Sequence, residues 1–261
     1  MKFNKLLPLF MAAGFVLTGC GQQGDAEAVK ASGFLNVGIT MYEPMDYFDE
    51  DGETITGFDA ELSNAFAEKL GVKTRFTTIK WDSKVLELNS KKIDLIWNDM
   101  TITEELKQNI DLSVAYATNY QCVVTKSANV ASYVDADSLA GKKIAVELGS
   151  AGEGAVAGYS NVSKVTSQEA ALLEVNAGTS DCAVIDVTMA NSVVGKGDFA
   201  GLSLIDASKI AFEKEDFGVG ARKGSNLTPL LNDFFKESFT SGLLSRLSEK
   251  YQVAINEASF K

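Results

Sequence analysis

The chemistry open to this chain is limited by the side chains that it lacks. The sequence contains 35 carboxylic residues and no histidine. A Ser–His–Asp or Cys–His nucleophile pair, a histidine-ligated zinc ion and an imidazole proton shuttle are therefore excluded. Two aspartates, Asp99 and Asp186, each follow an apolar run typical of a buried strand, and aromatic residues lie near them in the sequence. Two carboxylates among aromatic faces suit a cation, through ion pairing and cation–π attraction.

The charge of the chain narrows the class of partner. Its 261 residues carry a formal net charge of −11 at pH 7. Arginine occurs only at Arg75, Arg222 and Arg246. A protein that binds a phosphate backbone needs a basic surface, so we expect no nucleic-acid partner. The ligand is expected to be neutral or cationic.

The elements that must position the two aspartates follow an α/β pattern. Residues 35–40, 72–79 and 93–97 have the composition of strands, and residues 58–70 have helical spacing that stops at Gly71. A second strand–helix cycle begins near Gly141. Strands that alternate with helices predict parallel sheets, and ligands bind at the carboxyl ends of such strands.

The two cycles share a short stretch of similar sequence. Residues 86–94 and 173–181 match at a constant offset of 87, and the same offset places Asp99 opposite Asp186. Duplication and convergent turn chemistry both explain the match. Either way, the sequence predicts two α/β lobes that each present an aspartate at the carboxyl end of a strand.

The N-terminus has the pattern of an export signal. Lys2 and Lys5 precede an apolar run, residues 6–17, that is too short to cross a bilayer as a helix. The sequence Leu17-Thr-Gly-Cys20 that follows resembles the bacterial lipobox, in which the cysteine receives a lipid. We therefore expect a signal peptide at 1–19, lipidation of Cys20 and a flexible tether at 20–32.

Several other motifs have ordinary interpretations. Cys122 and Cys182 are expected either to form a disulfide, as export permits, or to serve as small buried hydrophobic residues. The Gly-rich segment 149–154 lacks the spacing of a phosphate loop. The acidic segment 43–51 lacks the calcium-loop pattern. We expect no metal site and no cofactor.

An ordered set of motifs covers most of the chain after residue 32. They include Gly57-Phe-Asp-Ala-Glu-Leu62, Lys92-Ile-Asp-Leu-Ile96, Met100-Thr-Ile-Thr-Glu104, Gly149-Ser150 and Phe217-Gly-Val219. In this order they resemble the bacterial extracellular solute-binding proteins, family 3, which supply polar amino acids to ABC transporters. The resemblance implies a two-lobed periplasmic-binding-protein-like fold (type II), in which two α/β lobes are joined by two crossover strands. Lobe one is expected at 33–117 with 217–261, and lobe two at 121–213.

The resemblance also implies a binding site, from which this sequence departs. The family arginine that grips the ligand α-carboxylate is replaced by Leu106, and a second carboxylate-binding hydroxyl by Ala151. Asp186 matches the family aspartate that holds the α-ammonium, and Asp99 adds a carboxylate where a small residue is usual. The expected ligand-binding residues are Tyr42, Trp81, Asn98, Asp99, Met100, Thr101, Leu106, Ser150, Ala151 and Asp186.

Two interpretations of this departure remain open at this point. In one, Asp99 faces the cleft and the ligand carries a prominent amine without a simple α-carboxylate clamp. In the other, Asp99 points away from the cleft and Lys84 or Lys107 replaces the missing arginine. Trp81 and Trp97 also have two interpretations, because each could lie either in the cleft or in the core.

The function that the resemblance implies is transport. The chain is expected to be the extracellular substrate-binding component of an ABC transporter, a monomer that delivers an amino acid or related amine to a permease. It would lie outside the cytoplasm, held at the membrane by its N-terminal lipid. One alternative is a dehydratase-like enzyme that uses Asp99, Glu147 or Glu43 as a general acid. Another is a ligand-sensing domain.

Overall fold

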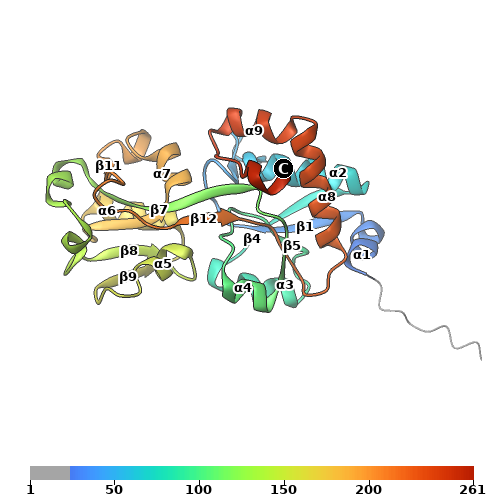
Figure 1. Cartoon of the computed structure of the whole chain (residues 1–261), viewed down its shortest axis with the longest axis horizontal. Helices are drawn as coiled ribbons and strands as arrows, with labels where there is room; N and C mark the ends of the chain where they lie inside the picture. The colour runs from blue at the N-terminus through green and yellow to red at the C-terminus, as the bar shows by residue number, and fades with distance from the viewer. Residues whose placement is uncertain (1–23) are drawn as a thin grey trace, which may run out of the picture.

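The computed structural model describes residues 24–261 and contains two large sheets, one in each of two lobes (Figure 1). The strands of the first sheet, in spatial order, are β4 (Lys73–Thr78), β1 (Phe34–Ile39), β5 (Leu95–Ile96), β13 (Gly220–Ala221) and β6 (Asp111–Leu112). Strand β1 pairs in parallel with β4 and β5, whereas β13 is antiparallel to its neighbours. A small ribbon of β2 (Tyr47–Phe48) and β3 (Ile55–Thr56) belongs to the same lobe.

The second sheet repeats the parallel arrangement. Its strands, in spatial order, are β11 (Leu202–Leu204), β7 (Ala117–Lys126), β10 (Cys182–Asp186), β8 (Ile144–Glu147) and β9 (Val162–Val165). Strands β10, β8 and β9 are mutually parallel, and β7 is antiparallel to β10. Because β8 and β10 are parallel, Glu147 and Asp186 end at the same edge of the sheet.

Helices cover both faces of each sheet. Those of the first lobe are α1 (Asp25–Ser32), α2 (Phe58–Leu70), α3 (Lys84–Asn89), α4 (Glu104–Asn109), α8 (Leu227–Thr240) and α9 (Leu243–Tyr251). Those of the second are α5 (Ala151–Ala155), α6 (Gln168–Ala177) and α7 (Val187–Val193). Val37 and Ile96, on strands of the first sheet, are buried in different apolar clusters. The strands are therefore apolar on both faces, as buried parallel sheets require.

Two strands connect the lobes. Strand β7 and strand β12 (Lys214–Phe217) pair antiparallel, with Lys214 opposite Tyr120 and Phe217 opposite Ala117, and they run side by side between the lobes (Figure 1). Two lobes joined by two such strands form the arrangement that permits hinge closure around a ligand. The predicted two-lobed α/β fold is confirmed.

The prediction of a flexible tether at 20–32 is partly wrong. Residues 25–32 form α1, whose Ala26 and Val29 are buried against the first lobe. Gly33 ends the helix in the left-handed conformation that glycine adopts readily. The sequence signal was missed because a helix this short gains its stability from docking rather than from its own propensity. The signal peptide and the lipidated Cys20 lie outside the described residues.

Arg222 ties α1 to the first sheet. Its Nε donates to Asp25 Oδ2 at 3.0 Å, its Nη2 to Asp94 Oδ1 at 3.1 Å, and its Nη1 to two backbone carbonyl oxygens. Replacing Arg222 with Met is expected to lower the free energy of unfolding by about 3 kcal/mol, because two half-buried carboxylates lose their partner. Urea denaturation measures this, with Arg75→Met as the control. An unchanged midpoint in Arg222→Met would contradict it.

The two remaining cysteines are separate. Cys122 and Cys182 are buried free thiols on the paired strands β7 and β10, where Cys122 lies opposite Ile185 and Cys182 opposite Thr125. The disulfide alternative is therefore wrong, and both act as small buried hydrophobic residues. Within residues 24–261, no helix has the length and apolarity needed to cross a membrane.

Candidate functional site

A cavity of about 650 Å³ lies between the lobes, at the carboxyl ends of strands from both sheets. The first lobe contributes the segment after β5, and the second lobe contributes the segments after β8 and β10. The structure brings every expected ligand-binding residue to this cavity: Tyr42, Trp81, Asn98, Asp99, Met100, Thr101, Leu106, Ser150, Ala151 and Asp186.

The lobes contact each other at the cavity rim. Lys84 Nζ of the first lobe donates to the backbone oxygen of Gly149 in the second lobe at 2.9 Å. At another point, Ser192 Oγ of the second lobe donates to Glu43 Oε1 of the first lobe at 2.9 Å. The structure is therefore in a closed arrangement, in which the cavity walls come from both lobes.

The wall formed by the first lobe is held by buried polar contacts. Asn98 Oδ1 accepts from the backbone nitrogen and the hydroxyl of Thr40, at 2.9 and 2.7 Å, and Asn98 Nδ2 donates to Asp46 Oδ2 at 2.7 Å. Asp99 has a φ of 51°, in the left-handed region that non-glycine residues rarely adopt. Its backbone nitrogen donates to Asp59 Oδ2 at 2.8 Å, which fixes this unusual conformation.

Asp99 lines the cavity, and its carboxyl group is buried. The residue is 4% exposed, and neither of its carboxyl oxygens has a hydrogen-bond partner. The buried hydroxyl of Tyr42 also lacks an aligned hydrogen bond, but it lies close enough to Asp99 for the two groups to shift each other's pKa. Burial raises the pKa of Asp99 well above its ordinary value, and the carboxylates of Asp59 and Asp186 raise it further. Asp99 lines the cavity while its two carboxyl oxygens are closed off from solvent, so the direction of this carboxyl group in a ligand complex stays a prediction.

Asp186, on the second lobe, differs from Asp99 because both of its carboxyl oxygens accept hydrogen bonds from the chain. Its Oδ1 accepts from Asn119 Nδ2 at 2.5 Å and from Gln121 Nε2 at 2.6 Å, and its Oδ2 accepts from Gln168 Nε2. Desolvation raises the pKa of Asp186 to about 6, against the opposing effect of these amide donors. A carboxylate offers about four acceptor positions, so one remains for a ligand.

Glu147 is a second buried carboxyl group on the same lobe. It ends β8, is 3% exposed, and its Oε1 has no hydrogen-bond partner. Desolvation raises the pKa of Glu147 to about 8, with a further contribution from Asp186 and an opposing one from the Lys84 ammonium. The sequence placed Glu147 near the cleft without fixing its direction, and the structure shows that it lines the cavity.

The family arginine has no equivalent in this cavity. Leu106 lies at its position, and none of Arg75, Arg222 and Arg246 lines the cavity. Lys107 forms a surface pair with Glu104 at 2.6 Å, so this candidate for replacing the arginine is excluded. Lys84 does line the cavity, but its Nζ already donates to the carbonyl oxygens of Trp81 and Gly149, at 3.2 and 2.9 Å.

In the second lobe, the backbone N–H groups at the start of α5 are also partly used by side chains of the protein. Ser150 Oγ accepts from Glu153 N at 3.2 Å, and Glu153 Oε2 accepts from Gly149 N at 2.6 Å. These contacts form a helix cap around the start of α5. A carboxylate of the protein thus occupies a donor that an anionic ligand group would otherwise use.

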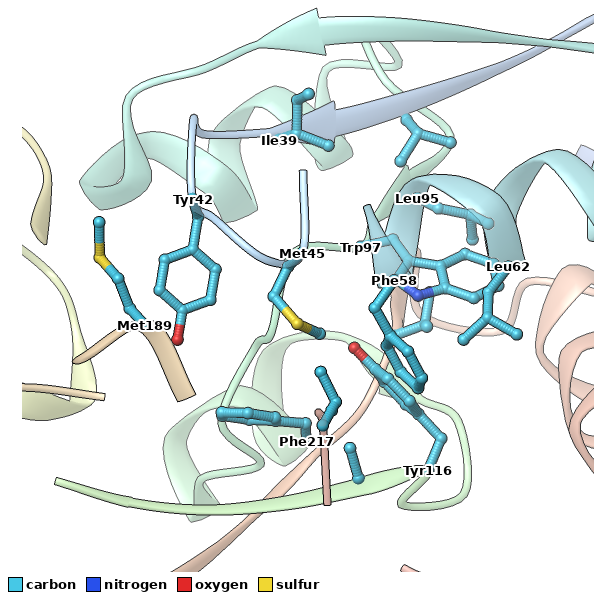
Figure 2. Packing of buried hydrophobic residues seen from close by; sticks show 14 of the residues in the cluster. Ile39, Tyr42, Met45, Phe58, Leu62, Leu95, Trp97, Tyr116, Met189 and Phe217 are labelled. Atoms are coloured by element: carbon cyan, nitrogen blue, oxygen red, sulfur yellow. The ribbon is translucent and has the colours of Figure 1, made fainter. Parts of the chain in front are cut away.

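The aromatic residues divide between the cavity and the core. Trp81 lines the cavity, with Lys84 Nζ 4.6 Å from its ring centroid. Trp97 and Tyr116 are fully buried behind the cavity, where both hydrogen-bond to Asp59. Figure 2 shows these two rings packed with Phe58, whereas Tyr42 lies beside Met189 of the other lobe. Trp97 is therefore a core residue and Trp81 a site residue.

Sequence reasoning missed several residues of the wall. Gln168 begins α6 and reaches Asp186, and Glu215 lies on the crossover strand β12. Glu215 Oε2 accepts from Thr101 Oγ1 at 3.1 Å and from Gln121 Nε2 at 3.0 Å. A polar residue in a connecting strand carries no local signal of a binding site, because only the closed fold brings it to the cleft.

The arrangement is suited to binding a cation. The cavity is lined by one ammonium group, Lys84, and by the carboxyl groups of Asp82, Asp99, Glu105, Glu147, Asp186 and Glu215. Among residues 24–261, no group of three or more Cys, Asp or Glu side chains has the geometry to hold a metal ion. The unpartnered oxygens call for hydrogen-bond donors on an organic ligand.

Comparison with known proteins gives a consistent set of relatives. The chain is 30% identical to the L-cystine-binding protein TcyJ of Escherichia coli (strain K12), over 94% of this chain and 92% of the relative. It is also 30% identical to the arginine-binding extracellular protein ArtP of Bacillus subtilis (strain 168), over 95% of this chain and 98% of the relative.

Solved structures agree with these relatives. An ancestral arginine-binding protein bound to arginine superposes with a TM-score of 0.78 at 33% identity, covering 84% of this chain and 98% of that one. The ancestral amino acid-binding protein AncCDT-1, a precursor of cyclohexadienyl dehydratase, superposes with a TM-score of 0.79 at 29% identity, covering 87% of this chain. The sequence profile of one family matches residues 35–254. The chain therefore belongs to the bacterial extracellular solute-binding proteins, family 3.

Proposed function

We propose that this protein captures an amine-bearing solute, an amino acid or a related amine, between its lobes and delivers it to the permease of an ABC transporter. The family and the amino-acid-binding relatives support this function. The closed interlobe cavity of about 650 Å³ has room for a ligand of this size.

The observation that carries the proposal is the pair of aspartates. Asp99 offers two unpartnered buried oxygens from the first lobe, and Asp186 offers one remaining acceptor position from the second. An ammonium group has three donors and no acceptor, so it satisfies both carboxylates at once. A ligand held in this way bridges the lobes and stabilises their closed arrangement.

The location of the protein follows from its N-terminal sequence and its family. We propose that it works outside the cytoplasm as a monomer, held at the membrane through a lipid on Cys20. Because α1 packs on the first lobe, that lobe would lie within a few residues of the anchor. Metabolic labelling with a radioactive fatty acid tests the anchor, and Cys20→Ser is expected to abolish the label.

The dehydratase alternative differs in what happens to the ligand. The likeness to AncCDT-1 and the raised pKa of Glu147, a requirement for a general acid, support it. The amino-acid-binding relatives support binding without turnover. We propose the binding function, in which a bound ligand is recovered unchanged after prolonged incubation; release of a dehydrated product would establish the enzyme instead.

A thermal-shift screen of the full-length protein tests the proposed function. The panel contains the amino acids, their decarboxylated amines, polyamines and quaternary amines. A ligand that binds only the folded state raises the melting temperature. A shift with an amine-bearing compound supports the proposal, and a flat response across the panel contradicts it.

Restoring the missing arginine is expected to change ligand preference. Leu106→Arg places a guanidinium at the position where relatives of this family grip the α-carboxylate, beside a cavity now rich in carboxylates. We expect lysine to bind about tenfold more tightly to the variant than to the wild type, and 1,5-diaminopentane to bind more weakly. Titration calorimetry with both compounds measures the reversal. Parallel changes for the two compounds would contradict it.

A further inference from the structure

Two buried carboxyl groups of the cavity have oxygens without partners, and they belong to different lobes. Asp99, after β5 of the first lobe, is 4% exposed with both oxygens unpartnered. Glu147, at the end of β8 in the second lobe, is 3% exposed with Oε1 unpartnered. A buried acceptor without a hydrogen bond is costly, so each of these groups calls for its own donor.

Three other charged groups of the wall already have partners. Asp186 accepts from three amide side chains. Glu215 Oε2 accepts from Thr101, Asn119 and Gln121. The Lys84 ammonium donates to two carbonyl oxygens, and it makes no direct contact with Glu147, although its charge lowers the pKa of Glu147. One ammonium group placed between Asp99 and Asp186 would leave Glu147 buried and unsatisfied.

We propose that the cleft selects a ligand with two cationic centres and no carboxylate, such as an α,ω-diamine, with one ammonium at Asp99 and Asp186 and the other at Glu147. The inference rests on the proposed function and names the substrate class for the same cavity. Glu147 then acts as a specificity residue that distinguishes a dication from a monocation.

The absence of an anion clamp is the second part of the inference. Leu106 provides no charge, Lys84 is held by backbone oxygens, and Glu153 occupies the backbone nitrogen of Gly149. A ligand α-carboxylate would lie among several carboxyl groups, opposed in the cavity wall by Lys84, two of whose three donors are already used. Repulsion from the carboxyl groups therefore disfavours it.

Three compounds of one carbon framework test the inference. Titration calorimetry of the full-length protein compares 1,5-diaminopentane with pentylamine, which lacks one amine, and with lysine, which adds a carboxylate. We expect the diamine to bind at least about tenfold more tightly than either of the others. Glu147→Gln is expected to remove the advantage over pentylamine, while pentylamine itself binds as before.

The controls separate this inference from the proposed function. Glu213→Gln makes the same charge change at an exposed position of the second lobe and should leave the preference intact. Glu147→Ala provides a second variant if the first unfolds. Equal affinity for the diamine and pentylamine, or tighter binding of lysine, overturns the inference while the proposed function stands. Failure of every amine and amino acid to bind overturns both.

Discussion

Replacing Asp99 with Asn is expected to weaken the binding of 1,5-diaminopentane at least about 100-fold. Asp99 is the buried carboxyl group with both oxygens unpartnered in the cavity. Removing one partner of a desolvated charge pair costs about 2–5 kcal/mol, because the remaining charge stays buried without compensation. Asn keeps the size of the side chain and loses only the charge. Titration calorimetry on the variant and the wild type measures the difference.

The same substitution is expected to leave the fold intact or to stabilise it. The backbone contact from Asp99 to Asp59 does not involve the Asp99 side chain, so the variant retains it. A neutral amide also avoids the cost of an unpaired buried carboxylate. The melting temperature of unliganded Asp99→Asn should therefore equal or exceed that of the wild type, and Asp233→Asn, on the surface of α8, serves as the control. Undiminished binding by a folded Asp99→Asn would refute this role.

Cation binding is expected to weaken as the pH falls from about 8.5 to about 5.5. The pKa of Glu147 is raised to about 8, that of Asp186 to about 6, and that of Asp99 well above its usual range. A cation pairs with the carboxylate forms, so acidification protonates the groups that bind it. Each proton displaced on binding costs about tenfold in affinity per pH unit below the pKa of its group. Calorimetry in buffers of different ionisation enthalpy measures the protons released.

The stability of the unliganded protein is expected to follow the opposite trend. The pKa values of Asp46, Asp59, Asp99 and Glu147 are all raised in the folded state, in each case mainly by desolvation. Between pH 5 and 8 the folded protein therefore holds more protons than the unfolded chain. Stability rises as the pH falls through this window, by about 2 kcal/mol or more. A melting temperature that drops from pH 8 to pH 5.5 without ligand would contradict these assignments.

Local patterns in the sequence encode which residues of each lobe line the cavity. Asp99 and Asp186 follow short apolar strands, and the carboxyl ends of parallel strands converge at one edge of a sheet. The family motifs then placed Leu106 and Ala151 in the same cavity. Asp99 and Asp186 belong to different sheets, however, so only the closing of the two lobes brings them to one cavity.

The features that were missed depend on contacts between distant segments. Helix α1 is held by Arg222, which is about two hundred residues away in the chain. Gln168 and Glu215 reach the site only because the lobes close around the two crossover strands. Trp97 and Tyr116 lie next to cleft residues in the sequence, yet their hydrogen bonds to Asp59 direct them into the core.

A crystal structure of the protein with the tightest-binding amine of the thermal-shift panel would show which side chains hold the ligand. We expect a ligand nitrogen within hydrogen-bonding distance of both Asp99 and Asp186, with Leu106 in apolar contact only. A ligand whose carboxylate is bound by Lys84, with no nitrogen at Asp99, would contradict it.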